Sequence, residues 1–348
     1  EPLITIAVYW GTAKDAADLV EYLNAPVGKN PNGGVDWAAV RARDGHPEPY
    51  GVVWFEYGNE SYHGDHRGHK VSAEEYARRY LEYRRAMRAV DPNVKLGAII
   101  QHGLDKWNRT VLRIAGKEID FAIEHTYLPN YYGNRGELPS RTIAEACVAC
   151  DAQLQKIYDD LNRLIYEETG RHIPIAVTEY NGHFVQERPV PYRQCLANAL
   201  RNAEHIRIML NPKNNILMAC FWQFSNEYWG MVRGYVHKGE RLRKQANFYV
   251  LQLYHQHFGD VLVESEVECD TFEFEGGANV RPRIGKPRPF KLFPENLLPK
   301  GAKWELRPCP GVRQRLEGDT VVAEFLGKDV NYYHPRIVLP AAPMTGYR

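Results

Sequence analysis

The sequence predicts a (β/α)8 barrel, of which six strands are visible, followed by a smaller β-rich region. Short apolar segments alternate with longer helical segments up to about residue 260, a pattern typical of parallel βαβ units. No G-x-G-x-x-G or G-x-x-x-x-G-K-[ST] motif follows any of these segments, which disfavours a nucleotide-binding doubly wound sheet. Polar residues gather at the C-terminal ends of the predicted strands, where barrel enzymes carry their catalytic residues.

The N-terminal half of the barrel region is expected to contain four strands and two helices. An apolar strand at 3–8 precedes a helix at 13–23 and a loop rich in Gly, Pro and Asn. A second strand at 52–57 follows that loop. Ser72 with Glu75 three residues later is a capping-box pattern, which predicts a helix from there to Val90, closed by Asp91-Pro92. Strands at 94–100 and 119–125 complete this half.

The C-terminal half is expected to alternate in the same way. A helix at 141–169 ends at Gly170, and strands at 173–179 and 216–224 flank a helix at 191–210. A last helix covers about 244–257. Cys147 and Cys150 fall on one face of the first of these helices. Because no second cysteine pair or histidine lies nearby in the sequence, they read as a reduced structural pair and not as a metal site.

The sequence divides near residue 260. Residues 1–260 are predicted to form the catalytic barrel, and residues 261–348 an accessory β-rich domain. Within the latter, 261–274 alternates like a β-hairpin, 282–299 is rich in Pro, Lys and Arg, and 304–339 again has strand-like segments. The segment 294–298 resembles the opening of a carbohydrate-binding β-sandwich, so a β-sandwich-like, truncated domain is the expectation here.

Composition excludes some partners and leaves others open. The chain has 348 residues, 44% of them hydrophobic and 25% charged, with a formal net charge of +1. This charge gives no electrostatic reason to expect nucleic acid or an anionic membrane as partner. No run of 18 or more apolar residues predicts a membrane-spanning helix. A neutral partner such as a carbohydrate fits, although the 22 Tyr and 7 Trp serve a core equally well.

Two glutamates have the positions that glycoside hydrolysis requires. Glu60 and Glu179 each end an apolar strand, so both side chains are expected at the barrel mouth. The reaction uses two carboxyl groups, one protonated and one ionised, on either side of the scissile bond. Taken one at a time, however, a glutamate at a strand end is more often a salt-bridge partner than a catalyst. The residues alone leave both interpretations open.

A family resemblance favours the catalytic interpretation. The segment Trp54–Glu60 resembles the Asn-Glu signature of barrel strand 4 in clan A glycoside hydrolases, and Val177–Asn181 resembles the strand 7 segment with the nucleophile. Further segments, at 21–24, 45–50, 74–77 and 89–92, are similar to family 51 α-L-arabinofuranosidases. The resemblance covers roughly residues 1–260. It implies that Glu60 is the acid/base, Glu179 the nucleophile and Asn59 a ligand of the sugar 2-hydroxyl, without metal or organic cofactor.

The resemblance implies further substrate-binding candidates. His125 and Tyr127 match the end of strand 6, where they would line the sugar site and reach the nucleophile, although a buried His and a packing Tyr explain them as well. Asn181 lies within the nucleophile motif. At the end of strand 8 the candidates are Trp222 and Gln223, followed by Asn226 and Trp229. This last run is more aromatic than a small furanose pocket requires, so an extended glycan cleft stays open. Trp10 is a similar stacking candidate, with a core role the simpler expectation.

The same resemblance places residues 3–8 at barrel strand 3. Strands 1 and 2 are therefore expected from a second polypeptide, from an N-terminal fragment or from sequence outside this chain, and a homo-oligomer is also compatible. Open sheet edges are poorly tolerated in a soluble monomer, which is the reason for this expectation. The sequence does not indicate a cellular compartment.

The predicted function is that of a retaining glycoside hydrolase acting on a plant-type or microbial polysaccharide or oligosaccharide by double displacement, most closely an α-L-arabinofuranosidase. Within the same clan, an endo-acting β-glycanase or another exo-glycosidase is the alternative. A catalytically silent carbohydrate-binding relative is the alternative from another class. Presence of both glutamates and of Asn59 argues against the silent relative.

Overall fold

A computed structural model describes most of the first 271 residues and four short strands beyond them. The described residues are 1–63, 71–131, 139–184, 191–225, 229–234, 239, 241–261, 263, 266–271, 274 and the strands within 305–338. The chain divides into two compact units, one of residues 1–62 and 71–287 and the other of residues 63–70 and 288–348. Each unit is described by itself.

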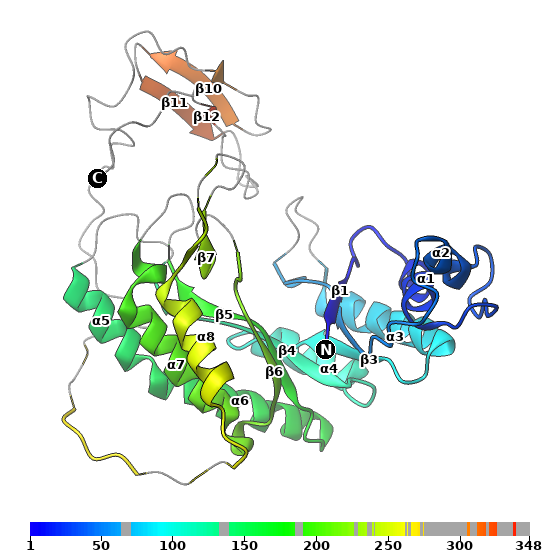
Figure 1. Ribbon diagram of the computed structural model, residues 1–348, viewed down its shortest axis with the longest axis horizontal. Helices are drawn as coiled ribbons and strands as arrows, with labels where there is room; N and C mark the ends of the chain where they lie inside the picture. Colours follow the sequence, from blue (N-terminus) through cyan, green and yellow to red (C-terminus); the bar gives the residue numbers. More distant parts are fainter. Residues whose placement is uncertain are drawn as a thin grey trace. The chain divides into compact units, whose positions relative to one another are not determined.

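The first unit is built on a six-stranded parallel sheet whose strands lie in the order of the sequence (Figure 1). The strands are β1 (Leu3–Ile6), β2 (Trp54–Tyr57), β3 (Lys95–Ile99), β4 (Phe121–Asn130), β5 (Ile175–His183) and β6 (Ile216–Phe221). A doubly wound sheet would reverse its strand order at a switch point, and this sheet does not. Sequential order is the topology of a (β/α)8 barrel, as the sequence predicts.

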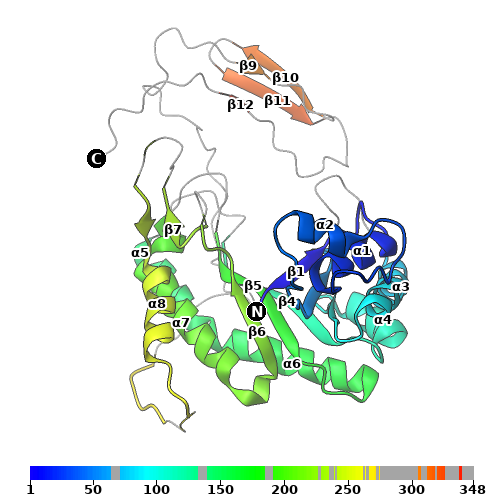
Figure 2. The ribbon, with the colours of Figure 1, turned by 45° about the vertical axis from the view of Figure 1, so that its right-hand side comes forward.

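The helices between the strands form one layer beside the sheet. They are α1 (Ala13–Asn24), α2 (Trp37–Arg43), α3 (Ala73–Val90), α4 (Asp105–Ala115), α5 (Ser140–Ala149), α6 (Asp151–Thr169), α7 (Leu196–Leu210) and α8 (Ala246–His257). α1 packs on α3, α3 on α4, α4 on α6, α6 on α7 and α7 on α8. Figure 2 shows α3, α4 and α6 along the same side of the strands. Right-handed crossovers between sequential parallel strands produce such a layer.

Tyrosines of α3 join the helix layer to the sheet. Ser72 caps this helix by accepting a hydrogen bond from the Glu75 amide at 3.1 Å, which confirms the predicted start. The buried hydroxyl groups of Tyr76 and Tyr80 donate to the carbonyl oxygens of Tyr57, at 2.9 Å, and Leu96, at 2.7 Å. These tyrosines bury large apolar surface and satisfy their own polar atoms. Part of the aromatic composition is therefore core and not sugar site.

The structure differs from the predicted elements in several places. The helix expected over 141–169 is two helices, because the chain breaks at Cys150, between α5 and α6. The helix expected from 191 begins as a 3-10 turn (Pro191–Gln194) before α7. α2 and α4 were not anticipated. β4 continues past its predicted end at residue 125 to Asn130, and β5 past residue 179 to His183, and these extensions carry site residues.

Cys147 and Cys150 are both buried and free, and the Cys150 thiol donates to the Cys147 carbonyl oxygen at 3.2 Å. Burial raises the pKa of both thiols. The pair thus fits the predicted reduced structural role.

Short antiparallel pairs lie between β6 and α8 and in the second unit. In the first unit, β7 (Val232–Arg233) pairs with β8 (Arg243–Lys244). In the second unit, β10 (Val312–Glu317) pairs with β11 (Thr320–Phe325), and β12 (Ile337–Val338) with β9 (Glu305–Leu306). The described residues of 261–274 include no strand, so the predicted hairpin is not seen there. The β-sandwich stays a prediction. Among the described helices, none is long and apolar enough to span a membrane.

Candidate active site

Glu60 follows β2 at the carboxyl end of the sheet. Gly58 has a φ of 74° and Glu60 a φ of 45°, so the chain turns through the left-handed region twice within three residues. A Cβ at Gly58 would lie 2.7 Å from Val8 Cγ2, so only glycine fits at that turn. The left-handed backbone of a non-glycine residue costs about 1–3 kcal/mol and is concentrated at functional sites. Here it aims the Glu60 side chain toward β4.

A β-bulge brings the next two site residues together. Glu124 of β4 pairs with Val177 of β5, but the following residue, His125, pairs with Glu179. Thr178 is therefore the extra residue of the bulge. Consecutive strand residues normally face opposite sides of a sheet. At this bulge, Thr178 and Glu179 both contact the His125 ring.

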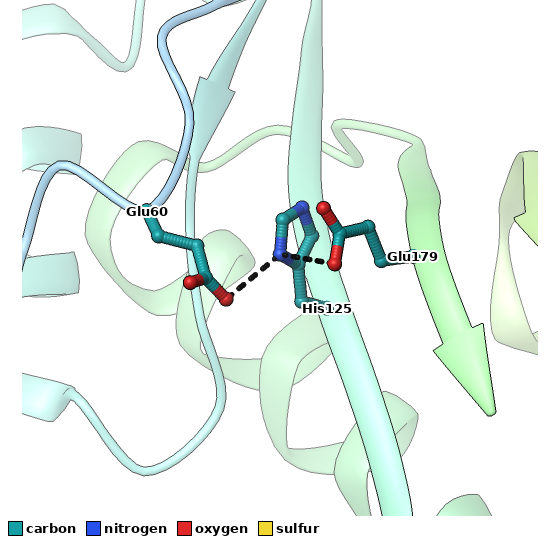
Figure 3. Close-up of side chains that lie close together, drawn as sticks. All are labelled: Glu60, His125 and Glu179. Atoms are coloured by element: carbon teal, nitrogen blue, oxygen red, sulfur yellow. Dashed lines mark hydrogen bonds and ion pairs between the residues drawn. The ribbon is translucent and has the colours of Figure 1, made fainter. Parts of the chain in front are cut away.

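The two predicted catalytic glutamates meet at His125 (Figure 3). The Nδ1 atom of His125 lies 3.0 Å from Glu60 Oε1 and 3.6 Å from Glu179 Oε2. One carboxylate oxygen from each glutamate and the His125 nitrogen all lie within 4.8 Å of one another. The Glu60 side chain is 26% exposed and that of Glu179 is 15% exposed, whereas His125 is 4% exposed. Both carboxylates thus reach solvent above a buried imidazole.

Electrostatics differ between the imidazole and the nucleophile candidate. Burial opposes protonation of His125, but the carboxylates of Glu56, Glu60 and Glu179 around the ring raise its pKa to about 10. These carboxylates thus favour the protonated form of the ring. Burial raises the pKa of Glu179, while His125 and the Tyr127 hydroxyl oppose that shift. The cation between the two glutamates favours the ionised form of Glu179.

The same three residues have a spacing that could in principle hold a cation. Two contacts explain this spacing without a bound cation. His125 Nδ1 contacts Glu60 directly at 3.0 Å, and Glu179 Oε2 accepts a short hydrogen bond from the Tyr127 hydroxyl. We therefore do not treat the three residues as metal ligands. That the chemistry needs no metal or organic cofactor stays a prediction.

Glu56 and Thr178 complete the surroundings of His125, and the sequence analysis did not single them out. The Thr178 hydroxyl lies 3.0 Å from His125 Nε2 and donates to Glu56 Oε1 at 3.3 Å. Glu56 Oε1 itself lies 3.8 Å from Nε2. Glu56 is 4% exposed. A buried glutamate in an apolar strand is rare unless it is partnered, and this was the signal available in the sequence.

Tyr127, a predicted site residue, lies beside Glu179 in an aromatic group. Its ring centroid is 5.3 Å from that of His183 and 5.5 Å from that of Trp229, which stands edge-on to it. Trp229 is only 5% exposed, and the Arg193 guanidinium stacks on its ring at 3.2 Å. Trp229 therefore packs against the Tyr127 ring, and little of the Trp229 side chain is exposed to contact a sugar. His183 and Arg193 were not predicted.

Asn181 lies at the site but faces inward. Its side chain is fully buried, and its amide donates to the Trp222 carbonyl oxygen at 2.8 Å. Its carbonyl oxygen accepts from the amides of Asn198 at 2.9 Å and Asn202 at 3.2 Å. Because the side chain is buried and bonded to the protein through both its nitrogen and its oxygen, we interpret Asn181 as a residue that positions the end of β6, whereas the sequence predicts a sugar ligand here.

The other predicted residues lie around the carboxyl ends of β1, β2 and β6. Asn59 is exposed next to Glu60, and its carbonyl oxygen accepts from the Tyr9 hydroxyl at 3.3 Å. Trp222 is 37% exposed, and the peptide bond to Gln223 is cis. Asn226 falls outside the described residues. Trp10 is 62% exposed, so it is not the core residue that was the simpler expectation.

A second carboxylate–histidine pair lies on the opposite face of β4. Glu124 is fully buried and forms a short hydrogen bond with His102 Nδ1, and the His102 amide donates to it at 2.8 Å. Burial opposes protonation of His102, but the Glu124 carboxylate raises its pKa. Gln101 donates to Glu124 Oε1 at 3.3 Å and to the backbone carbonyl oxygen of His125 at 2.8 Å.

Comparison with known sequences points to arabinofuranosidases. The family model of the α-L-arabinofuranosidase 1 domain matches residues 9–135. An exo-α-(1→6)-L-arabinofuranosidase of Bifidobacterium longum is 27% identical over 191 residues, which is 53% of this chain and 35% of that protein. The intracellular exo-α-(1→5)-L-arabinofuranosidase 1 of Bacillus subtilis is 33% identical over 162 residues, 42% of this chain and 31% of that protein. The chain thus spans about a third of the length of these curated relatives.

Comparison with solved structures agrees. A thermostable family 51 α-L-arabinofuranosidase from Thermotoga petrophila superposes with a TM-score of 0.66 at 27% identity, over 79% of this chain and 53% of that one. The α-L-arabinofuranosidase of Thermotoga maritima, solved with arabinose, has a TM-score of 0.64 at 26% identity, over 78% of this chain and 52% of that one. The chain is related in sequence and in its partial (β/α)8 barrel fold to family 51 enzymes of glycoside hydrolase clan A.

Proposed function

We propose that this chain hydrolyses terminal α-L-arabinofuranosyl groups of plant-type or microbial oligosaccharides and polysaccharides with retention of configuration. Three findings support the proposal: the juxtaposed Glu60 and Glu179, the match of residues 9–135 to the arabinofuranosidase domain, and the related family 51 structures. We assign the catalytic barrel to residues 1–260 and an accessory β-rich domain to residues 261–348.

The separation of the two carboxyl groups carries the proposal. Retaining glycosidases hold them about 5–5.5 Å apart, and inverting enzymes about 6.5–9.5 Å apart to admit a water. Here an oxygen of Glu60 lies within 4.8 Å of an oxygen of Glu179. This separation is below the range of inverting enzymes, so direct attack by Glu179 is the chemistry that the geometry favours.

The reaction then follows from the roles of the two glutamates. Glu179 attacks the anomeric carbon while Glu60 transfers its proton to the leaving oxygen, which breaks the glycosidic bond and forms a glycosyl ester. Tyr127 and His125 both contact Oε2 of Glu179, so Oε1 is the attacking atom in this proposal. Glu60, now ionised, accepts a proton from a water as that water attacks the anomeric carbon, which breaks the ester bond and releases Glu179 as a carboxylate. Proton and charge balance over the two steps.

An endo-acting glycanase of the same clan is the second candidate. The half-exposed Trp222 at the end of β6 and the exposed Trp10 after β1 favour it, because flat aromatic faces bind successive sugar rings. Product analysis separates the two candidates: exo action releases monosaccharide from the first turnover, whereas endo action releases oligosaccharides.

Hydrolysis of a panel of aryl glycosides, with the α-L-arabinofuranoside included, tests the proposal. We expect the wild-type chain to hydrolyse the arabinofuranoside with retention, as followed by NMR of the first anomer released, and Glu179→Ala to lose this activity. An inverted first product would contradict the mechanism. Failure of the wild type on every aryl glycoside and on arabinan would contradict the function and favour a carbohydrate-binding relative.

We also infer that further polypeptide covers the two edges of the six-stranded sheet. Among the described strands, β1 pairs only with β2, and β6 only with β5. No residue of β6 is fully buried, whereas most of β5 is. Unpaired edges and exposed apolar side chains next to them are sites of association. The cover is proposed to be two strands from another segment, another polypeptide or a second copy of the chain.

A further inference from the structure

The buried Glu56 is not needed for the two-carboxylate mechanism. It lies on β2, shortly before the acid/base candidate Glu60 in the sequence, and is 4% exposed. Burying a carboxylate costs several kcal/mol unless hydrogen bonds and an opposite charge compensate. The partners of Glu56 are the Thr178 hydroxyl, at 3.3 Å, and the His125 ring, whose Nε2 lies 3.8 Å away. Among the described residues, Glu56 therefore contacts the site through Thr178 and through the ring that faces Glu60 and Glu179.

The hydrogen bonds behind the ring fix which nitrogen carries a proton. The Thr178 hydroxyl has one proton, and it donates that proton to Glu56. Its oxygen, 3.0 Å from His125 Nε2, is then an acceptor, so Nε2 must be an N–H donor. A neutral ring with this proton would present a lone pair on Nδ1 to the two carboxylates. A doubly protonated ring presents an N–H group instead, which suits two acceptors 3.0 and 3.6 Å away.

We propose, building on the function proposed above, that Glu56 and Thr178 are positioning residues that orient His125 as an imidazolium with Nδ1–H directed between Glu60 and Glu179. In the first step the nucleophile Glu179 is ionised, and Nδ1–H stabilises it. Once Glu179 has become an ester and Glu60 has lost its proton, the same N–H stabilises the Glu60 carboxylate. The cation faces one ionised carboxylate in each half-reaction, and its own proton is not consumed.

The groups around the ring agree with this assignment. Among the described residues, the titratable groups that face His125 or its carboxylate partners are Glu56, Glu60 and Tyr62 from β2 and the turn after it, Tyr127 from β4, Glu179 from β5 and Cys220 from β6. Arg193, from the 3-10 turn before α7, is a cation that acts on Tyr127. The described charged groups that face the ring itself are the three carboxylates. His125 is thus the positive group set among three carboxylates, and loss of the proton on Nδ1 would leave these charges unbalanced.

Thr178→Val tests the positioning role kinetically, because valine keeps the shape of threonine and removes the hydroxyl. We expect kcat on the aryl arabinofuranoside to fall about tenfold, the loss expected for one hydrogen bond to a charged group, with KM changed less than about twofold. Thr178→Ser restores the hydroxyl and should return kcat to within about twofold. The acid limb of the pH profile of kcat/KM should move to higher pH in Thr178→Val, since a less well-held cation lowers the pKa of Glu179 less.

Thr126→Val is the matched control. Thr126 is a buried threonine on β4 whose hydroxyl also donates to a buried carboxylate, Glu124, at 3.2 Å, but it does not contact the His125 ring. We expect this variant to leave the position of the acid limb unchanged. An equal shift in both threonine variants, or no difference between Thr178→Val and Thr178→Ser, would overturn the proposal.

NMR of the imidazole nitrogens separates the proposal from the function on which it builds, because it requires no turnover. In the 15N-histidine-labelled chain, with the His125 signals assigned by their loss in His125→Asn, both nitrogens should carry protons between about pH 6 and about pH 8. In Glu56→Gln, Nδ1 should lose its proton within that range while Nε2 keeps it. A wild-type ring that is neutral at about pH 7 would overturn the proposal even if the chain is active. If the spectra are as expected but the chain is inactive, the positioning role of Glu56 and Thr178 is supported and the proposed function is contradicted.

Discussion

At the scale of single residues, two buried glutamates, on β2 and β4, have the same kind of partner. Glu56 of β2 lies behind His125, and Glu124 of β4 binds His102. Buried carboxylates are tolerated when they are paired and hydrogen-bonded, and a histidine supplies both conditions. The two pairs differ in what the imidazole faces on its other side. His102 is partly exposed, whereas His125 faces the two glutamates of the proposed reaction.

The acid/base role of Glu60 makes a prediction that depends on the leaving group. General acid catalysis contributes about 10²–10⁴-fold, but only where the leaving oxygen needs a proton. We expect Glu60→Gln to slow hydrolysis of an arabinose disaccharide by about that factor, and to slow bond cleavage of an activated aryl arabinofuranoside, followed as the pre-steady-state release of aryl alcohol, much less. Steady-state turnover of the aryl substrate should still fall, because release of the ester also needs Glu60.

Glu75→Gln is a suitable control for this prediction, since Glu75 is an exposed residue in the first turn of α3. It should match the wild type on both substrates. Equal loss of bond cleavage on the two leaving groups in Glu60→Gln would argue that Glu60 orients the substrate and does not transfer a proton.

At the scale of elements, the sequence predicts the strands well and their ends poorly. The apolar runs that begin β4 and β5 are clear, but both strands continue through polar residues such as His125, Thr126 and Asn181. These residues stay in the sheet because their hydrogen bonds are satisfied within the site, which composition does not reveal. The bulge at Thr178 has no glycine to indicate it, and the break at Cys150 has neither glycine nor proline.

The same limit explains the site. The positions of Glu60 and Glu179 at strand ends could be predicted, because parallel strands bring their carboxyl ends to one edge of a sheet. Which of these side chains face the protein interior could not be predicted, because it depends on the register between neighbouring strands. Asn181 was expected to bind sugar, whereas the structure uses it to join β5, β6 and α7.

Substitution of Asn181 tests this structural interpretation. Asn181→Ala would leave the buried amides of Asn198 and Asn202 and the carbonyl oxygen of Trp222 with fewer partners. Each buried polar group left unsatisfied costs about 1–3 kcal/mol, so we expect the free energy of unfolding to fall by at least about 2 kcal/mol in urea titrations. Asn93→Ala, in an exposed turn, should change it by less than about 0.5 kcal/mol. A raised KM with unchanged stability would instead indicate a sugar ligand.

At the scale of the first unit, the central strands of the sheet are paired on both sides and buried, whereas each edge strand pairs with one described neighbour. Central strands such as β3, β4 and β5 are buried on both faces, as barrel strands are. β6 has alternating exposed residues, and Leu217 on it is 38% exposed. α7 and α8 also leave apolar side chains exposed, among them Leu200 and Leu253. The barrel fold explains this pattern if further strands lie against β1 and β6.

An association measurement tests that explanation. Light scattering of the purified 40.1 kDa chain should report a larger mass, or denaturing mass spectrometry a second polypeptide in the same material. Hydrogen exchange should find the β6 amides protected in that assembly. Leu217→Arg should weaken the association, whereas Ile114→Arg should not, because Ile114 is equally exposed, at 39%, but lies on α4 away from both edges. A soluble, monodisperse 40.1 kDa monomer would contradict the proposal, since it would mean that the described edges need no cover.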